Sequence, residues 1–332
     1  MNIIRKLLLP IVPIYFMVTW LRNKLYDLGI KKSKSYKFPV ICVGNLSAGG
    51  TGKTPMIEYL IRLLKDDFKV ATLSRGYKRK TDGFQLANTT STADTIGDEP
   101  FQFYTKFKDS VIVAVDANRQ TGIENLQKKK PNVILLDDAY QHRKVTPGFS
   151  VLLTTYANPF YKDIVLPTGN LREPRSGANR ADVIVVTKCP KGLSLNEKSN
   201  LVKRIRPEKH QHVFFSTIDY SNTVIATDKT ERIENLSPFT LVTGIANATP
   251  LVNYLNAKNL NFEHLNFKDH YNFTLNDIEN LEQKDVIVTT EKDYMRLKQF
   301  ESLKPKLFYL PITVTIDDSN KLNALIKEFV RP

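Results

Sequence analysis

Beyond residue 37, short apolar runs alternate with segments in which apolar residues recur at helical spacing. Runs rich in Val, Ile and Leu predict buried strands, and their alternation with helices predicts a largely parallel sheet covered by helices. The expected fold class is therefore α/β. The strands predicted for this sheet are residues 39–44, 69–74, 111–115, 133–137, 150–153 and 182–187.

A second set of apolar runs follows the polar stretch 219–234 and predicts a smaller α/β domain. Residues 313–316 could pair with residues 212–218 as a two-strand hinge, and the last helix, from about Asn320, could pack on either domain. The strands predicted for the smaller domain are residues 240–243, 262–267, 285–289 and 307–310. The expected division is an N-terminal segment, a first domain and a second domain at 1–37, 38–218 and 219–332.

The composition fits such a two-domain protein. The chain has 332 residues, of which 42% are hydrophobic and 25% are charged, and this excludes disordered and collagen-like classes. Its two cysteines, Cys42 and Cys189, cannot form a disulfide framework. We expect both to be core thiols in a reducing compartment.

The charge is strongly basic and unevenly distributed. The net charge is +14, and residues 1–40 carry half of it, with eight Lys and Arg residues against one acid, Asp27. A basic balance indicates an anionic partner such as nucleic acid, phosphate or lipid headgroups. Because the basic residues flank an apolar run, we expect lipid and no nucleic-acid partner; a nucleic-acid-stimulated NTPase is the less favoured hypothesis.

That apolar run extends without charge from Leu7 to Leu21 and contains Pro10 and Pro13. A bilayer span needs about 20 residues, and no small-residue cleavage site follows as in a signal peptide. We predict an interfacial segment, with Trp20 at headgroup depth and basic flanks near anionic lipid. An N-terminal helical hairpin packed on the core is the alternative, and the two interpretations are compatible.

A glycine-rich motif follows the first predicted strand and precedes a predicted helix at residues 55–64. This order is typical of a P-loop, in which backbone N–H groups bind ATP phosphates, Lys53 reaches the β- and γ-phosphates, and Thr54 binds Mg²⁺. Pro55 suits the first helical turn. Ser47 stands where the usual pattern has Gly. The motif is Ser47-Ala48-Gly49-Gly50-Thr51-Gly52-Lys53-Thr54.

Two carboxylates, Asp137 and Asp138, end another predicted strand. One can hold Mg²⁺ through water while the other orients its surroundings. The segment from Thr187 to Pro190 lacks the Asp with which guanine-specific P-loop proteins read their base, so ATP is the expected nucleotide. Ala48 stands where membrane-associated partitioning ATPases carry an extra Lys, which weakens that comparison.

Further motifs follow one another along the chain. They are the segment from Pro39 into the P-loop, Ser74-Arg75-Gly76-Tyr77, Gly97-Asp98-Glu99-Pro100, Asp137-Asp138-Ala139-Tyr140-Gln141-His142, Leu171-Arg172-Glu173-Pro174, Asp269-His270-Tyr271 and Thr290-Glu291-Lys292-Asp293. This ordered set resembles the tetraacyldisaccharide 4′-kinase family of lipid A biosynthesis over roughly residues 1–300. The chain departs from the family pattern at Ala139, Tyr140 and Asn170.

The resemblance implies ATP-dependent phosphorylation of the 4′-hydroxyl of an acylated glucosamine disaccharide 1-phosphate, at the cytoplasmic face of the bacterial inner membrane. A membrane-associated P-loop switch ATPase acting on a protein partner is the alternative. By resemblance, Asp98 is the base that takes the hydroxyl proton, supported by His270. Further candidates for substrate or phosphate contacts are Arg75, Tyr77, Glu99, Arg119, Gln141, His142, Arg172 and Glu173.

Several of these candidates also allow structural interpretations from the residues alone. Lone arginines are commonly solvated, and Tyr77 could equally belong to the core. His270 could be a hydrogen-bonded surface or core histidine. The segment from Thr290 to Asp293 has the spacing of a helix cap between strand and helix.

Overall fold

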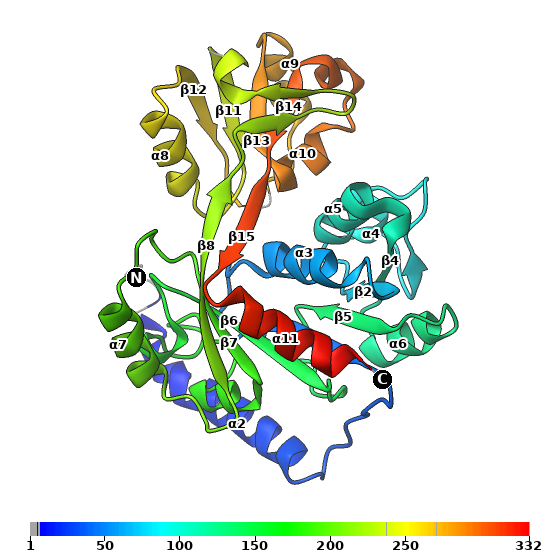
Figure 1. The fold of residues 1–332 in the computed structure, drawn as a ribbon, viewed down its shortest axis with the longest axis vertical. Helices are drawn as coiled ribbons and strands as arrows, with labels where there is room; N and C mark the ends of the chain where they lie inside the picture. The colour runs from blue at the N-terminus through cyan, green and yellow to red at the C-terminus, as the bar shows by residue number, and fades with distance from the viewer. Residues whose placement is uncertain (1–4, 6, 237, 270, 332) are drawn as a thin grey trace.

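The computed structural model describes residues 5, 7–236, 238–269 and 271–331 (Figure 1). In this part of the chain, a nine-stranded sheet has the order β15-β8-β7-β6-β1-β5-β2-β4-β3. Its strands are parallel except for the outer strands β3 and β15, which pair antiparallel with β4 and β8. The strands are β1 (Val40–Asn45), β2 (Val70–Ser74), β3 (Gln85–Leu86), β4 (Val111–Val115), β5 (Val133–Asp137), β6 (Phe149–Thr155), β7 (Val183–Thr187), β8 (His212–Tyr220) and β15 (Ile312–Ile316).

Helices cover both faces of this sheet because successive strand side chains point to opposite faces. Val40 and Cys42 face a core that includes α6 and α7, whereas Ile41 and Val43 face a core that includes α3, α5 and α11. The strands are therefore buried on both sides, as their continuous apolar runs predict. The helices of this domain are α3 (Lys53–Leu64), α4 (Ala93–Ile96), α5 (Asp98–Phe107), α6 (Arg119–Gln127), α7 (Leu195–Ile205) and α11 (Ser319–Val330).

The smaller domain contains a six-stranded sheet of order β10-β9-β14-β13-β11-β12 in the described residues. Strands β12, β11, β13 and β14 are mutually parallel. The stretch 219–234, noted only as polar from the sequence, contributes the antiparallel pair β9 and β10. The elements are β9 (Thr223–Ile225), β10 (Thr230–Arg232), β11 (Phe239–Thr243), α8 (Thr249–Ala257), β12 (Phe262–Asn266), α9 (Leu275–Glu282), β13 (Ile287–Thr290), α10 (Glu291–Leu297) and β14 (Leu307–Leu310).

Strands β8 and β15 connect the two domains, and Figure 1 shows the smaller domain standing on this pair. They pair antiparallel from Ile312 opposite Tyr220 to Ile316 opposite Ser216, which confirms the predicted two-strand hinge. The last helix, α11, packs on the first domain: the Phe329 ring lies 5.4 Å from the Phe149 ring. The sequence left open on which domain the last helix packs, and the structure places it on the first domain.

The N-terminal segment forms α2 (Val12–Asp27) after the 3₁₀ turn η1 (Leu9–Ile11), with Pro13 in the first turn. Its inner face contacts the first domain and its outer face exposes large apolar side chains. Within the described residues, no helix has the length and apolarity that crossing a bilayer requires. The other 3₁₀ turns are η2 (Lys108–Ser110), η3 (Phe160–Lys162), η4 (Arg175–Arg180), η5 (Ile233–Leu236) and η6 (Glu301–Lys306).

Candidate active site

The P-loop lies between the end of β1 and the start of α3. Gly52, at φ +89°, is the residue before the first helical turn, where a left-handed backbone favours glycine. Lys53 begins the helix, and its Nζ lies 3.4 Å from Asn45 Oδ1 and 3.7 Å from Asp138 Oδ1. This geometry brings a cation to the positive end of a helix, where phosphate groups bind.

Two side chains at the end of β7 hold the carbonyl groups of the P-loop. Thr187 Oγ1 donates to Thr51 O at 2.8 Å, and Lys188 Nζ donates to Gly50 O at 2.7 Å. Burial lowers the pKa of Lys188, while the charge of Asp269 opposes this shift. These two hydrogen bonds hold the P-loop against the end of β7. Sequence reasoning used this segment only to predict which nucleotide base is bound, and it missed the contact of this segment with the P-loop.

The segment from Asn170 to Glu173 runs beside the first residues of the P-loop. Ala48 N donates to Asn170 O and Arg172 N donates to Leu46 O, both at 2.7 Å. The Arg172 guanidinium reaches Asp138, with Nη1 2.9 Å from Oδ1. This pairing brings two distant sequence motifs together at the acidic end of β5.

The Glu173 carboxylate is buried and accepts three hydrogen bonds. They come from Asn23 Nδ2 at 2.6 Å, Arg180 Nη2 at 2.8 Å and Gln141 Nε2 at 3.0 Å. Gln141 Nε2 also donates to Asn45 O at 2.8 Å. In this conformation Glu173 therefore joins the N-terminal helix α2 to the segment that follows β5.

The two acids of β5 differ in environment. Asp137 is buried; its Oδ2 accepts from Ser74 Oγ at 3.2 Å, and its Oδ1 has no hydrogen-bond partner among the described residues. Burial, reinforced by the charges of Asp138 and Glu99, raises the pKa of Asp137 to about 7. Burial also penalises the charged form of Asp138, but Lys53 and Arg172 outweigh it and lower the pKa of Asp138.

This acid pair fits a magnesium ion. Mg²⁺ is commonly held by one or two carboxylates together with substrate phosphates, and it prefers oxygen ligands. The buried, unpartnered Oδ1 of Asp137 is an oxygen that such a cation would satisfy. Within the described part of the chain, no group of three or more His, Cys, Asp or Glu side chains is placed to hold a metal.

Arg119 and His142 lie on the other side of these acids. Arg119 is buried and donates to the backbone carbonyls of Asp116 and Asp137. Burial, strengthened by the charge of Arg119, lowers the pKa of His142 to about 4, so its imidazole is neutral at pH 7. Its Nε2 is buried without a hydrogen-bond partner among the described residues.

Arg75 and Tyr77 follow β2 and are both exposed, Tyr77 to 59%. The alternative that Tyr77 belongs to the core is therefore wrong. Their turn packs closely against the start of α5: a Cβ added to Gly97, whose φ is +92°, would lie 3.2 Å from the Gly76 Cα. This close approach brings Arg75 and Tyr77 near Asp98 in the fold.

Asp98 and Glu99 occupy the first turn of α5 and face cations from the smaller domain. Arg296 of α10 forms an ion pair with Asp98, with Nε 3.0 Å from Oδ2. Lys292 Nζ lies 3.4 Å from Glu99 Oε1. His270, the expected partner of Asp98, lies outside the described residues.

Sequence reasoning missed Arg296, although part of the signal was present. The predicted cap of α10 is confirmed, because Thr290 Oγ1 accepts from Asp293 N at 3.2 Å. Arg296 lies in the helix that this cap begins, three residues after Asp293. A helix start can be read from the sequence, but the contact between α10 and α5 cannot.

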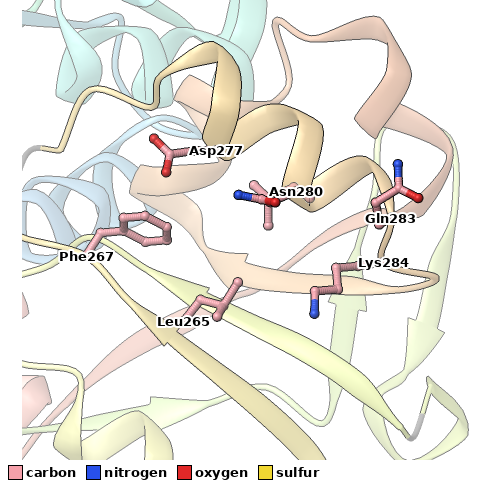
Figure 2. Close-up of a pocket in the computed structure, with 7 residues that line it drawn as sticks. Leu265, Phe267, Asp277, Asn280, Gln283 and Lys284 are labelled. Carbon is pink, nitrogen blue, oxygen red and sulfur yellow. The ribbon is translucent and has the colours of Figure 1, made fainter.

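A hollow of about 360 Å³ lies between β12 and α9 in the smaller domain (Figure 2). None of the predicted site residues that the structure describes lines it, so it is separate from the P-loop chemistry. Phe267 and Asp277, both labelled in Figure 2, each contact Tyr271 in the loop that follows β12. The lining residues are Leu265, Phe267, Asp277, Asn280, Leu281, Gln283 and Lys284.

Comparisons with known proteins show which family the chain resembles along its whole length. The family model described as tetraacyldisaccharide-1-P 4′-kinase matches residues 4–331. A tetraacyldisaccharide 4′-kinase of Flavobacterium johnsoniae is 51% identical over 340 residues, covering 100% of this chain and 98% of the relative. One of Bacteroides thetaiotaomicron is 44% identical over 357 residues, covering 99% and 94%. A crystal structure of LpxK from Aquifex aeolicus in complex with ATP has a TM-score of 0.79 and 31% identity, covering 99% of this chain and 100% of that one.

Proposed function

The chain belongs to the tetraacyldisaccharide 4′-kinase family, and we propose that it transfers the γ-phosphoryl group of ATP to the 4′-hydroxyl of a tetraacyldisaccharide 1-phosphate. The observation that carries this function is the meeting of a P-loop lysine, two strand-end acids and Arg172 at one site. Neither the fold nor the relatives favour the alternative, a switch ATPase acting on a protein partner.

The nucleotide would be held by the residues of the P-loop. Their backbone N–H groups and the Lys53 ammonium face the phosphate oxygens, and α3 adds the positive end of its dipole. Thr54, Asp137 and Asp138 would hold Mg²⁺, which supplies charge compensation on the phosphates when bound. Lys53 and Arg172 both reach Asp138, so this carboxylate orients the two cations as well.

Asp98 would act as the general base, with His270 supporting it. The hydroxyl oxygen bonds to the γ-phosphorus while the bond to the β,γ-bridging oxygen breaks and ADP leaves. The hydroxyl proton passes to the Asp98 carboxylate, and a neighbouring imidazole can share it. The position of Asp98 in the first turn of α5, beside the turn that carries Arg75 and Tyr77, supports this role.

The acceptor would bind among the donors around the P-loop. Arg75, Arg119, Arg172 and His142 are the candidate ligands for phosphate or sugar oxygens, and exposed Tyr77 is another. Gln141, Glu99 and Glu173 are candidates for sugar hydroxyls. Because Glu173 already accepts three hydrogen bonds, its contribution would come through Gln141 and the N-terminal helix.

The N-terminal segment would place the enzyme on an anionic membrane surface, at the cytoplasmic face of the bacterial inner membrane. Ile14, Met17 and Val18 of α2 are exposed to 59%, 60% and 58%, and their spacing places them on one helix face. Tyr15, the next residue of the same helix after Ile14, donates from its Oη to Arg172 O at 3.1 Å. A lipid headgroup at α2 would thus lie near the residues that flank the P-loop.

A direct assay tests this function. The full chain is incubated with ATP, Mg²⁺ and a tetraacyldisaccharide 1-phosphate, and the lipid is analysed by mass for one added phosphate. ADP release should depend on the acceptor and should not respond to nucleic acid. Lys53→Ala is the inactive control, because its lost ammonium acts on phosphate charge. ADP release that ignores the acceptor would favour the switch ATPase.

A further inference from the structure

We propose that Arg296 is a positioning residue that sets the Asp98 carboxylate and the neighbouring loop, residues 267–269 and 271–273, in one fixed relation. This inference rests on the proposed role of Asp98 as the base. Arg296 belongs to α10 of the smaller domain, whereas Asp98 begins α5 of the first domain. The contact therefore joins the two domains at the reacting group.

The Arg296 guanidinium divides its donors between two targets. Its Nε and Nη2 both donate to Asp98 Oδ2, at 3.0 Å for Nε. Its Nη1 donates to the Tyr271 carbonyl at 3.2 Å and lies 3.8 Å from Asp293 Oδ1. Since a guanidinium is planar and its donors are fixed in one fork, holding one target determines the direction of the other.

The setting of Arg296 favours such a role over that of a surface ion pair. Its side chain is 9% exposed and that of Asp98 is 17% exposed. Burial works against the charge of Arg296, but the hydrogen bond to Asp98 and the charge of Asp98 outweigh it and raise its pKa. Water competes little for a pair this enclosed, and the pair keeps one geometry.

The loop that receives the third donor is itself fixed from the opposite side. The Tyr271 ring lies 4.8 Å from the Phe267 ring and 5.5 Å from the Phe273 ring. Tyr271 Oη donates to Asp277 Oδ2 at 3.1 Å, and the same oxygen accepts from the Thr274 backbone at the start of α9. Figure 2 shows Phe267 and Asp277 at one end of the hollow beside α9. Tyr271 is thus held through its backbone by Arg296 and through its side chain by Asp277.

The consequence for catalysis is geometric. General-base catalysis needs the base within hydrogen-bonding reach of the hydroxyl, and a misplacement of about 1 Å can cost on the order of 10²-fold in rate. Arg296 restrains the carboxylate through Oδ2, and this restraint limits how far the base can move from the hydroxyl. A cation beside the carboxylate also favours its ionised form, as a base requires.

The test compares Arg296→Gln, Arg296→Lys, Asp98→Ala and the Arg296→Gln/Asp98→Ala double variant, with kcat, KM for ATP and thermal unfolding measured for each. Arg296→Gln should lower kcat about 10- to 100-fold with little change in KM for ATP. Lysine should restore part of the rate, since it keeps the charge but loses the fork. In the Asp98→Ala background, Arg296→Gln should cost almost nothing more.

Lys298→Gln is the matched control. Lys298 follows α10 and also contacts α5, with Nζ 3.1 Å from Thr105 Oγ1 and 4.2 Å from the Phe101 ring centre, but it does not contact Asp98 in any described interaction. Its removal tests whether loss of any cation between the domains lowers kcat. We expect its kcat to stay within about twofold of wild type.

A pH profile of kcat separates positioning from a structural effect. Glu99, Asp293 and Lys292 are the other charged groups around this pair, and all three remain in Arg296→Gln. We expect its acidic limb to move to higher pH, because the carboxylate loses its cation. If Arg296→Gln does not fold, the pH profile of kcat is measured for Arg296→Lys instead.

The role of Asp98 as the base and the positioning role of Arg296 would be refuted by different results. Wild-type kcat in Asp98→Ala would refute Asp98 as the base, and with it the proposed mechanism. Multiplicative losses in the double variant, or an unmoved acidic limb, would refute the positioning role of Arg296 while leaving Asp98 as the base.

Discussion

Glu58 of α3 and Glu291 of α10 share one ammonium and one amide across the contact between the domains. Lys106 Nζ lies 2.7 Å from Glu58 Oε2 and 2.8 Å from Glu291 Oε2. Gln102 Nε2 donates to Glu58 Oε1 at 2.8 Å and to Glu291 Oε2 at 2.9 Å. Two buried carboxylates repel each other, so the pair is stable only through these shared donors. The contact is therefore sensitive to the protonation of Glu291.

Stability should fall with rising pH through Glu291. Burial, reinforced by the charge of Glu58, raises the pKa of Glu291, and Lys106 acts in the opposite direction. The folded state therefore binds this proton more tightly than the unfolded state, whose pKa is near 4.5. The stabilisation is fully present below about pH 4.5 and is lost as the pH rises through the raised pKa.

Glu291→Gln tests this, because an amide does not titrate. We expect its melting temperature to fall less than that of the wild type between about pH 5 and pH 8. Glu301→Gln is the control: that acid is 82% exposed and belongs to the same domain, so the wild-type slope should persist. An unchanged slope in Glu291→Gln would assign the pH dependence to another group.

Substitution of the β5 acids should change the magnesium requirement. Asp137→Ala removes the buried carboxylate with an unpartnered oxygen, and Asp138→Ala removes the acceptor shared by Lys53 and Arg172. We expect each variant to need several-fold more Mg²⁺ for half-maximal rate and to turn over more slowly. Rates measured across a magnesium titration at saturating ATP check this. Wild-type magnesium curves in both variants would exclude these acids as ligands.

The strands of both domains were predictable because they are buried. A strand covered on both faces must be apolar throughout, so β1, β5 and β7 each stand out as a continuous run. The pair β9 and β10 was missed because each has three residues and β10 is mostly exposed, so no apolar run marks it. Short strands of this kind are specified by their pairing partners and not by a pattern of their own.

The candidate site also has parts that the sequence predicts and parts that it does not. The P-loop and the end of β5 could be located because each motif combines its chemistry with its own strand end. The contacts of Arg172 with Asp138 and of Arg296 with Asp98 join residues 34 and 198 positions apart. No local pattern encodes such a distance, and only the tertiary packing of the chain determines which side chains meet.

The outer face of α2 should govern membrane association separately from ATP binding. Deleting residues 1–30 would weaken association, but it would also remove Asn23, which donates to buried Glu173. The triple variant Ile14→Ser/Met17→Ser/Val18→Ser changes only exposed side chains. We expect weaker sedimentation with anionic vesicles and slower use of membrane-embedded acceptor, with ATP affinity unchanged, because buried apolar area sets such binding.

Asn23→Ala is the complementary variant. It leaves the exposed face intact and removes one donor to Glu173, so vesicle binding should persist. If the triple serine variant sediments as fully as the wild type, the membrane contact lies elsewhere on the chain.

Asp98 and His270 should behave as one catalytic unit. Asp98 begins α5 of the first domain, and His270 belongs to the sequence of the second, so their cooperation requires the domains to come together over the nucleotide. The contacts of Arg296 with Asp98 and of Lys106 with Glu291 are two points at which the domains already meet. Catalysis should therefore depend on this interface.

A double-mutant cycle on kcat measures the dependence. Asp98→Ala and His270→Ala should each lower kcat by about 10²- to 10⁴-fold, the range for loss of a general base. The double variant should be little worse than the worse single one, since residues that act together are not additive. ATP affinity should barely change, because the P-loop residues hold the triphosphate. Multiplicative losses, or a main effect on ATP affinity, would mean that the two residues act independently and that another group accepts the proton.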